Sequence, residues 1–117
     1  MTLAEIKDLL NAEVIVGHNK HDLEIRTAFG ADLMSDVLAF ARPGCLLITG
    51  LTNPMSVRTS YALDIAAILL CRGKRPTEEA VKAARELGIP ILTTRYILFE
   101  TCGRLYENGI LGCITQV

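Results

Sequence analysis

The sequence predicts an α/β fold, a single domain over residues 1–117 with a mainly parallel sheet and helices on both faces. Three observations lead to this prediction. From Cys45 onward, strand-like runs alternate with helical patterns, and the connections between them are short. The strand-like runs are apolar throughout, which is typical of strands buried on both faces. The 117 residues suit one hydrophobic core, since 50% are hydrophobic and 21% are charged.

The first half of the chain is predicted to contain two helices and two strands. Thr2 is placed to cap a helix whose apolar residues recur on one face. Residues 13–17 (EVIVG) read as a strand that ends at a glycine, and residues 23–29 (LEIRTAF) alternate as a half-exposed strand does. An amphipathic helix follows, with Asp32 as its candidate N-cap and Pro43 as its stop.

The second half carries clearer signals. Asn53 precedes a proline, which is the favoured order of an N-cap and a first helical residue, and Thr77 opens a second capping pattern. Gly88 is placed to end that second helix. Strands are predicted near 45–49, 65–71 and 90–93, and because short helical crossovers join them, we expect them to be parallel neighbours in one sheet. A further helix over 95–109 is predicted, followed by a last strand or a tail.

Composition excludes several classes of function. Twelve basic and thirteen acidic residues give a net charge of −1, which argues against a nucleic-acid partner or an anionic-membrane partner. The longest apolar run, 65–71, is too short to span a bilayer, and acidic residues in the N-terminal helical pattern argue against a signal peptide. We therefore expect a cytoplasmic protein whose widely spaced cysteines are free, and we predict no metal site and no cofactor.

The candidate site lies where predicted parallel strands end. Loops that start at Thr49, Arg72 and Thr93 all leave the carboxyl ends of strands, so they should gather at one edge of the sheet, where ligands of such folds bind. Glycine backbone, hydroxyls, a helix N-terminus and basic side chains together suit an anionic or phosphorylated ligand. The predicted ligand-binding residues are Thr49, Gly50, Asn53, Arg72, Gly73, Lys74, Thr94 and Arg95.

Simpler interpretations of these residues remain open. Asn53 is fully explained as a helix cap, and a basic run such as 72–75 is more often a solvated loop than a site. Asp32 and Asp36 lie four residues apart, a spacing that suits a cation but also a solvated first turn. The chain has neither a P-loop nor a G-x-G-x-x-G fingerprint, and no catalytic constellation can be assembled from spacing, so no catalytic residue is predicted.

Two motifs carry a resemblance to a known family. Residues 32–37 (DLMSDV) and 103–106 (GRLY), the latter followed by Gly109-Ile110, resemble the DRTGG-domain family, and the likeness extends from about Val14 to Ile110. The letters that name the family are not spelled out, because Gly50 is not followed by Asp-Arg. The resemblance implies a fold of the MurF and HPr-kinase N-terminal-domain type, without the P-loop domain that carries kinase chemistry.

The resemblance also implies a class of function. Members are regulatory modules, some of them in pyrophosphatases controlled by adenine nucleotides and diadenosine polyphosphates, and stand-alone versions accompany iron-only hydrogenase systems. We expect a non-catalytic module that binds a small anionic ligand, with an adenine nucleotide as the family's example, and that forms a homodimer. Two alternatives are a protein-interaction subunit of a hydrogenase or another metabolic complex, without a ligand, and an enzyme for a small phosphorylated metabolite.

The apolar composition of a small chain also favours the homodimer, since some apolar surface should stay exposed. The best prediction for its interface is the strand over 23–29 and the helix after it. Ile25, Phe29 and Met34 are the side chains that could extend beyond one core.

Overall fold

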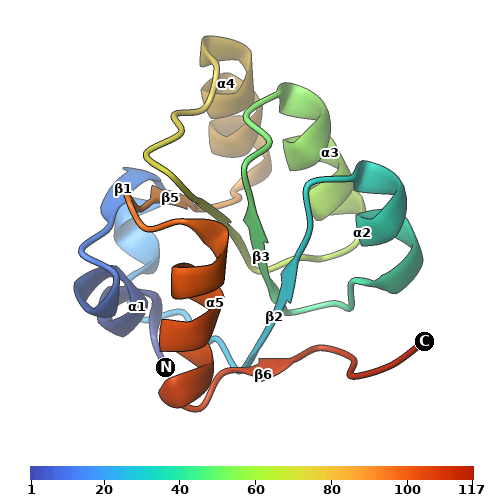
Figure 1. Ribbon diagram of the computed structural model, residues 1–117. Coiled ribbons are helices and arrows are strands. Elements are labelled where there is room, and N and C mark those ends of the chain that lie inside the picture. Colours follow the sequence, from blue (N-terminus) through green and yellow to red (C-terminus); the bar gives the residue numbers. More distant parts are fainter.

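The computed structural model describes residues 1–117 and contains one sheet of six strands with helices on both of its faces (Figure 1). The helices are α1 (Leu3–Leu9), a 3₁₀ turn η1 (His18–Lys20), α2 (Met34–Phe40), α3 (Pro54–Ala62), α4 (Glu78–Leu87) and α5 (Leu98–Glu107). The strands are β1 (Glu13–Val16), β2 (Thr27–Gly30), β3 (Leu46–Thr49), β4 (Ala67–Leu70), β5 (Ile91–Thr93) and β6 (Leu111–Gly112).

The strand order confirms the predicted parallel sheet. The strands lie in the order β1-β5-β4-β3-β2-β6, and every neighbouring pair is parallel except β1 and β5. Strands β3, β4 and β5 are the three runs predicted to be parallel neighbours. The antiparallel β1 brings residues 11–13 to the edge of the sheet at which the parallel strands end, because Glu13 pairs with Thr93.

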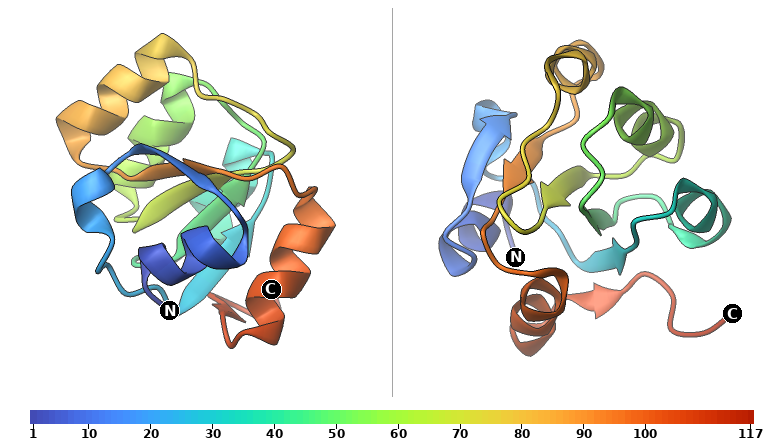
Figure 2. Two further views of the ribbon diagram at one scale, coloured as in Figure 1. Left: turned by 90° about the vertical axis from the view of Figure 1, so that its left-hand side faces the viewer. Right: turned by 45° about the horizontal axis from the view of Figure 1, so that its top comes forward.

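Successive side chains of the central strands point to opposite faces of the sheet and pack into two separate hydrophobic cores. Leu47 and Ile68 point to one face, where α2, α3 and α4 cover them, while Leu46 and Leu69 point to the other, where α1 and α5 cover them. Figure 2 shows the two groups of helices on opposite sides of the sheet. Strands buried on both faces have no polar side to expose, which explains their uniformly apolar sequence.

The capping predictions are confirmed at three helices and wrong at one. The side chains of Thr2, Asn53 and Thr77 accept hydrogen bonds from the first turns of α1, α3 and α4. Asp32 does not cap α2, because the helix begins one residue later than expected and Leu33 takes the N-cap position without a side-chain bond. The Asp32 carboxylate is instead bound to the loop after β3.

Other boundaries shift in ways that matter for function. Strand β2 begins only at Thr27, and the Ile25 side chain is completely buried in the monomer, so the prediction that Ile25 extends beyond one core is wrong. The C-terminal residues form β6, a two-residue strand parallel to β2. None of the helices combines the length and the apolar character that crossing a membrane requires.

Candidate functional site

The loops that follow β3, β4 and β5 meet at one edge of the sheet, as the sequence predicts. The Gly73 N–H donates to the Thr94 carbonyl at 2.8 Å, which joins the loops after β4 and β5. The Thr77 N–H donates to the Thr52 carbonyl at 3.0 Å, which joins the loops after β3 and β4. Backbone hydrogen bonds therefore fix the relative positions of all three loops.

A polar cleft of about 420 Å³ opens at this edge, a volume within the range of ligand pockets. Its lining contains no hydrophobic residue and comes from three segments of the chain, namely the start of β1, the loop after β4 and the loop after β5. The residues that line it are Asn11, Glu13, Arg72, Gly73, Arg75, Thr93, Thr94 and Arg95.

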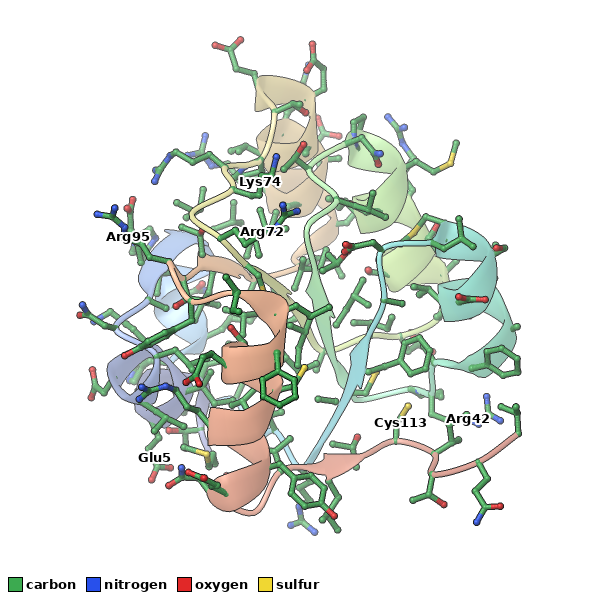
Figure 3. All side chains as sticks on the ribbon, in the orientation of Figure 1. Glu5, Arg42, Arg72, Lys74, Arg95 and Cys113 are labelled. Atoms are coloured by element: carbon green, nitrogen blue, oxygen red, sulfur yellow. The ribbon has the colours of Figure 1, made fainter.

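Half of the predicted ligand-binding residues line this cleft and half do not. Arg72, Gly73, Thr94 and Arg95 contribute to its wall, whereas Thr49, Gly50, Asn53 and Lys74 lie outside it. Figure 3 shows the division among the labelled side chains, with Arg95 extending toward β1 and Arg72 toward β3. The expected single pocket shared by all three loops is therefore not formed.

Arg72 links the cleft to the loop after β3. Its Nη2 atom lies 2.8 Å from the position that a Cβ atom would take on Gly50, so the guanidinium rests directly on this glycine. The Asp32 carboxylate lies on the same spot, since its Oδ1 atom accepts hydrogen bonds from the Gly50 N–H at 2.7 Å and from the Thr49 hydroxyl at 3.1 Å. A larger residue at position 50 would have to displace the Arg72 side chain.

The backbone amides expected to bind an anion are already occupied. Asp32 holds the Gly50 N–H, Thr94 holds the Gly73 N–H, and the Asn53 side chain accepts from the Ser56 N–H at 3.0 Å as the cap of α3. The contribution of glycine at position 73 is conformational, since its φ of +67° favours a residue without a Cβ. These three amides are therefore unavailable to a ligand, and the arginine side chains are the charged donors of the cleft.

The cleft also concentrates backbone strain. Three non-glycine residues of the chain have positive φ, and two of them, Asn11 at 47° and Arg72 at 59°, line the cleft. Such conformations cost free energy and cluster at functional sites. The Arg72 conformation is held by a hydrogen bond from its N–H to the Tyr96 carbonyl at 2.9 Å.

The side chains of the two threonines in the cleft lining fix its loops through hydrogen bonds. The Thr93 hydroxyl donates to the Lys74 carbonyl at 2.6 Å, and the buried Thr94 hydroxyl donates to the Leu10 carbonyl at 2.8 Å. Each hydroxyl oxygen keeps acceptor capacity, but its proton is used within the protein. Arg95 and Arg72 have no salt-bridge partner, so their guanidinium groups are the unpaired charges of the cleft lining.

Sequence reasoning missed Asn11 and Glu13 as cleft residues, whereas Arg75 and Thr93 belong to the loops that it predicted to gather at this edge. Arg75 binds Glu13 through two hydrogen bonds of 3.1 and 3.0 Å. The hydrogen bonds and positive charge of Arg75 lower the pKa of the Glu13 carboxyl below its ordinary value. The antiparallel place of β1 could not be read from the chain, although Asn11 directly after a helix is a recognisable signal for a positive-φ turn.

The cysteines do not contribute to the cleft. All four are free, and burial raises the pKa of the Cys45 thiol to about 11, which makes it a poor nucleophile and ligand. No group of three or more His, Cys, Asp or Glu side chains is arranged to hold a metal ion.

The parallel sheet with an open carboxyl edge and the basic cleft define an α/β module of the kind that binds small ligands. The chain belongs to the DRTGG-domain family, whose model matches residues 5–107. Among solved structures it is similar to the CBS and DRTGG domains of the regulatory region of Clostridium perfringens pyrophosphatase, complexed with the activator diadenosine tetraphosphate. The TM-score is 0.75 at 18% identity, which establishes the shared fold, and the match covers 93% of this chain and 47% of that chain.

Proposed function

We propose that this protein is a non-catalytic regulatory module that binds a small anionic ligand, an adenine nucleotide or a related phosphate ester, in the cleft beside Arg95. The observation that carries the proposal is the cleft itself, an all-polar cavity at the carboxyl edge of a parallel sheet with three arginines and one carboxylate in its lining. About half of the pyrophosphatase chain described above shares this fold, and its regulatory region was solved with the activator diadenosine tetraphosphate.

The ligand class follows from the charges of the cleft. Arg75 is neutralised by Glu13, so Arg95 and Arg72 supply the net positive charge. Guanidinium groups present several donors in one plane, an arrangement that suits phosphate and carboxylate oxygens. The cleft volume of about 420 Å³ leaves room for a group larger than a bare phosphate.

We include the absence of catalysis in the proposal, and the lowered pKa of the Glu13 carboxyl supports it. This residue carries the only carboxylate of the cleft lining. A general acid or base works best when its pKa lies near the operating pH, whereas Arg75 moves the pKa of Glu13 in the opposite direction. We also propose that the module is a cytoplasmic homodimer, a setting in which its free cysteines stay reduced.

The test is calorimetry with AMP, ATP, diadenosine tetraphosphate and inorganic phosphate as the titrants. Arg95→Ala should weaken binding about ten- to a hundredfold, because a charge-assisted hydrogen bond contributes roughly 1.5–3 kcal/mol. Arg72→Ala should act in the same direction, since it removes the second unpaired guanidinium of the cleft lining.

Lys74→Ala is the matched control. It removes the same unit of charge from the same loop, but Lys74 does not line the cleft, so affinity should stay within about twofold. An equal loss in the Lys74 and Arg95 variants would point to a diffuse field rather than a site. If none of the titrants binds, the alternative function, a protein-interaction subunit without a ligand, is favoured over the proposal.

A further inference from the structure

Helix α5 presents an apolar stripe to solvent. Its inner side is buried against the sheet, where Thr101 is 0% and Leu105 is 1% exposed. On its outer side Phe99 is 81% exposed and Tyr106 is 67% exposed. Together with Gly103 these residues follow the i, i+4, i+7 spacing of one helix face. Figures 1 and 2 show that no other element of the chain covers this side of α5.

Gly103 at the centre of the stripe has no explanation within the monomer. It lies in the middle of α5 and has no positive φ, and a Cβ atom placed on it would meet no atom within 4 Å. Glycine inside a helix is destabilising relative to alanine. Glycine at such a position is explained when another backbone approaches the helix closely, because a Cβ atom would keep the two backbones apart.

The other exposed apolar side chains do not form a comparable surface. Leu33 and Leu38 lie five residues apart at α2, and Met55 and Tyr61 lie six apart on α3, so neither pair shares a helix face. Single exposed apolar residues are normal on protein surfaces and need no partner. The stripe on α5 therefore differs from the exposed apolar residues of α2 and α3 in that its members share one helix face.

The stripe is self-complementary. Phe99 and Tyr106 are equally far in sequence from the middle of the stripe, between Cys102 and Gly103. A two-fold axis at that point would set each Phe99 against Tyr106 of a second copy, and the small Gly103 would lie at the crossing. The bordering charges do not oppose this approach, because Arg104 already binds Glu100 at 3.1 Å within the same helix.

The exposed apolar area approaches the apolar area that one partner buries in a standard dimer interface. Phe99, Tyr106 and the neighbouring Leu111, which is 57% exposed, together expose on the order of 400 Å², given the usual 150–250 Å² of an aromatic side chain. Tyr106 and Leu111 also border one apolar groove of about 170 Å³. A standard interface buries about 800 Å² per partner, of which roughly 56–65% is apolar, or about 450–520 Å².

We propose that a second copy of this chain docks on the outer face of α5, with the two helices antiparallel and crossing at Gly103. This inference rests on the homodimer in the proposed function and names its interface. It does not involve the cleft, which lies at the carboxyl edge of the sheet.

The test is sedimentation equilibrium of the full chain over a series of protein concentrations. Phe99→Ala and Gly103→Leu should each weaken dimerisation at least tenfold, the first by removing an anchor and the second by blocking close approach. Leucine at position 103 has open space and a better helix propensity, so the variant should fold. Met55→Ala, on α3, removes another exposed apolar side chain and should dimerise like the wild type.

Gly103→Cys provides a second measurement. With glutathione disulfide as the oxidant, two thiols at the crossing should form one interchain disulfide while glutathione is released as the thiol. The wild type, whose four native cysteines are free, is the control and should stay uncrosslinked.

A wild type that is monomeric throughout the series overturns the inference, and so does a dimer that both Phe99→Ala and Gly103→Leu leave intact. Neither result overturns the proposed ligand binding, which Arg95→Ala tests separately. Conversely, the wild type could dimerise, lose the dimer in the Phe99→Ala and Gly103→Leu variants, and bind no nucleotide. That result would support this interface and contradict only the ligand proposal.

Discussion

The contact between Asp32 and the loop after β3 allows a quantitative prediction. The Asp32 Oδ1 atom accepts from the Gly50 N–H at 2.7 Å and from the Thr49 hydroxyl at 3.1 Å. A hydrogen bond to a charged acceptor contributes roughly 1.5–3 kcal/mol when it is buried. Thr49 is fully buried, but Asp32 itself is exposed, so solvent screens the pair and the sum should be smaller. We expect Asp32→Ala to lower the free energy of unfolding by about 1–2 kcal/mol.

Urea denaturation followed by circular dichroism measures this loss directly. Asp32→Asn keeps an oxygen acceptor without the charge, so it should lose about half as much. Asp36→Ala is the matched control, because Asp36 lies four residues further on, in the first turn of α2, and the carboxylate bonds to the β3 loop come from Asp32. Its loss should stay below about 1 kcal/mol, the usual contribution of an acidic side chain near a helix N-terminus.

A double-mutant cycle isolates the bond to Thr49. Thr49→Val alone also removes the acceptor of the Leu51 N–H at 3.2 Å, so its single effect is not the Asp32 bond. The coupling free energy between Asp32→Ala and Thr49→Val should be about 0.5–1 kcal/mol, as is usual for residues in contact. Coupling within about 0.3 kcal/mol of zero would refute a contribution of the Asp32–Thr49 hydrogen bond to stability and leave only the bond to the Gly50 N–H.

Three further changes should have measurable outcomes. Leu47→Ala truncates a fully buried side chain of the central sheet and should cost about 2–5 kcal/mol in urea denaturation, so a loss below this range would contradict the packing described here. The Arg75 hydrogen bonds lower the pKa of Glu13, so the pair stabilises the fold above the ordinary pKa of 4.5 and this contribution is lost as the pH falls through the lowered value. Glu13→Gln should therefore flatten the acid limb of the stability profile, and an unchanged limb would show that the pair contributes nothing. Burial raises the pKa of Cys45 to about 11, so iodoacetamide at pH 8 should label Cys45 only after unfolding, and rapid labelling of the native protein, detected by mass spectrometry, would contradict this.

The sequence predicted those parts of the fold that depend on local signals. Thr2, Asn53 and Thr77 cap helices because their side-chain oxygens reach amides three residues ahead, a purely local geometry. The parallel order of β3, β4 and β5 follows from short helical crossovers between apolar runs. The gathering of three loops at one edge is a direct consequence of that order.

The details of the site depended on contacts that no local pattern encodes. Asp32 looked like a helix cap, but a nearby loop offers it two donors, and this tertiary contact takes precedence over the local one. Lys74 and Arg72 are two residues apart, yet the positive φ of Arg72 and of Gly73 turns the chain, so that only Arg72 borders the cleft. Asn11 and Glu13 join the cleft only because β1 runs antiparallel at the sheet edge.

A short segment of chain joins the cleft to α5, and this connection leads to a last prediction. Arg95 lines the cleft, the next residue, Tyr96, accepts the Arg72 N–H at 2.9 Å, and Arg104 of α5 stacks over the Tyr96 ring at 4.1 Å. A ligand that orders Arg95 therefore acts on the residues that lead into α5. By linkage, any effect of a ligand on dimerisation must equal the effect of dimerisation on ligand affinity. We expect a nucleotide that binds the cleft to shift the dimer dissociation constant by about five- to a hundredfold, and Tyr96→Ala to abolish the shift while both separate equilibria persist. Sedimentation with and without the nucleotide measures this, and equal dissociation constants would show that the two sites are independent.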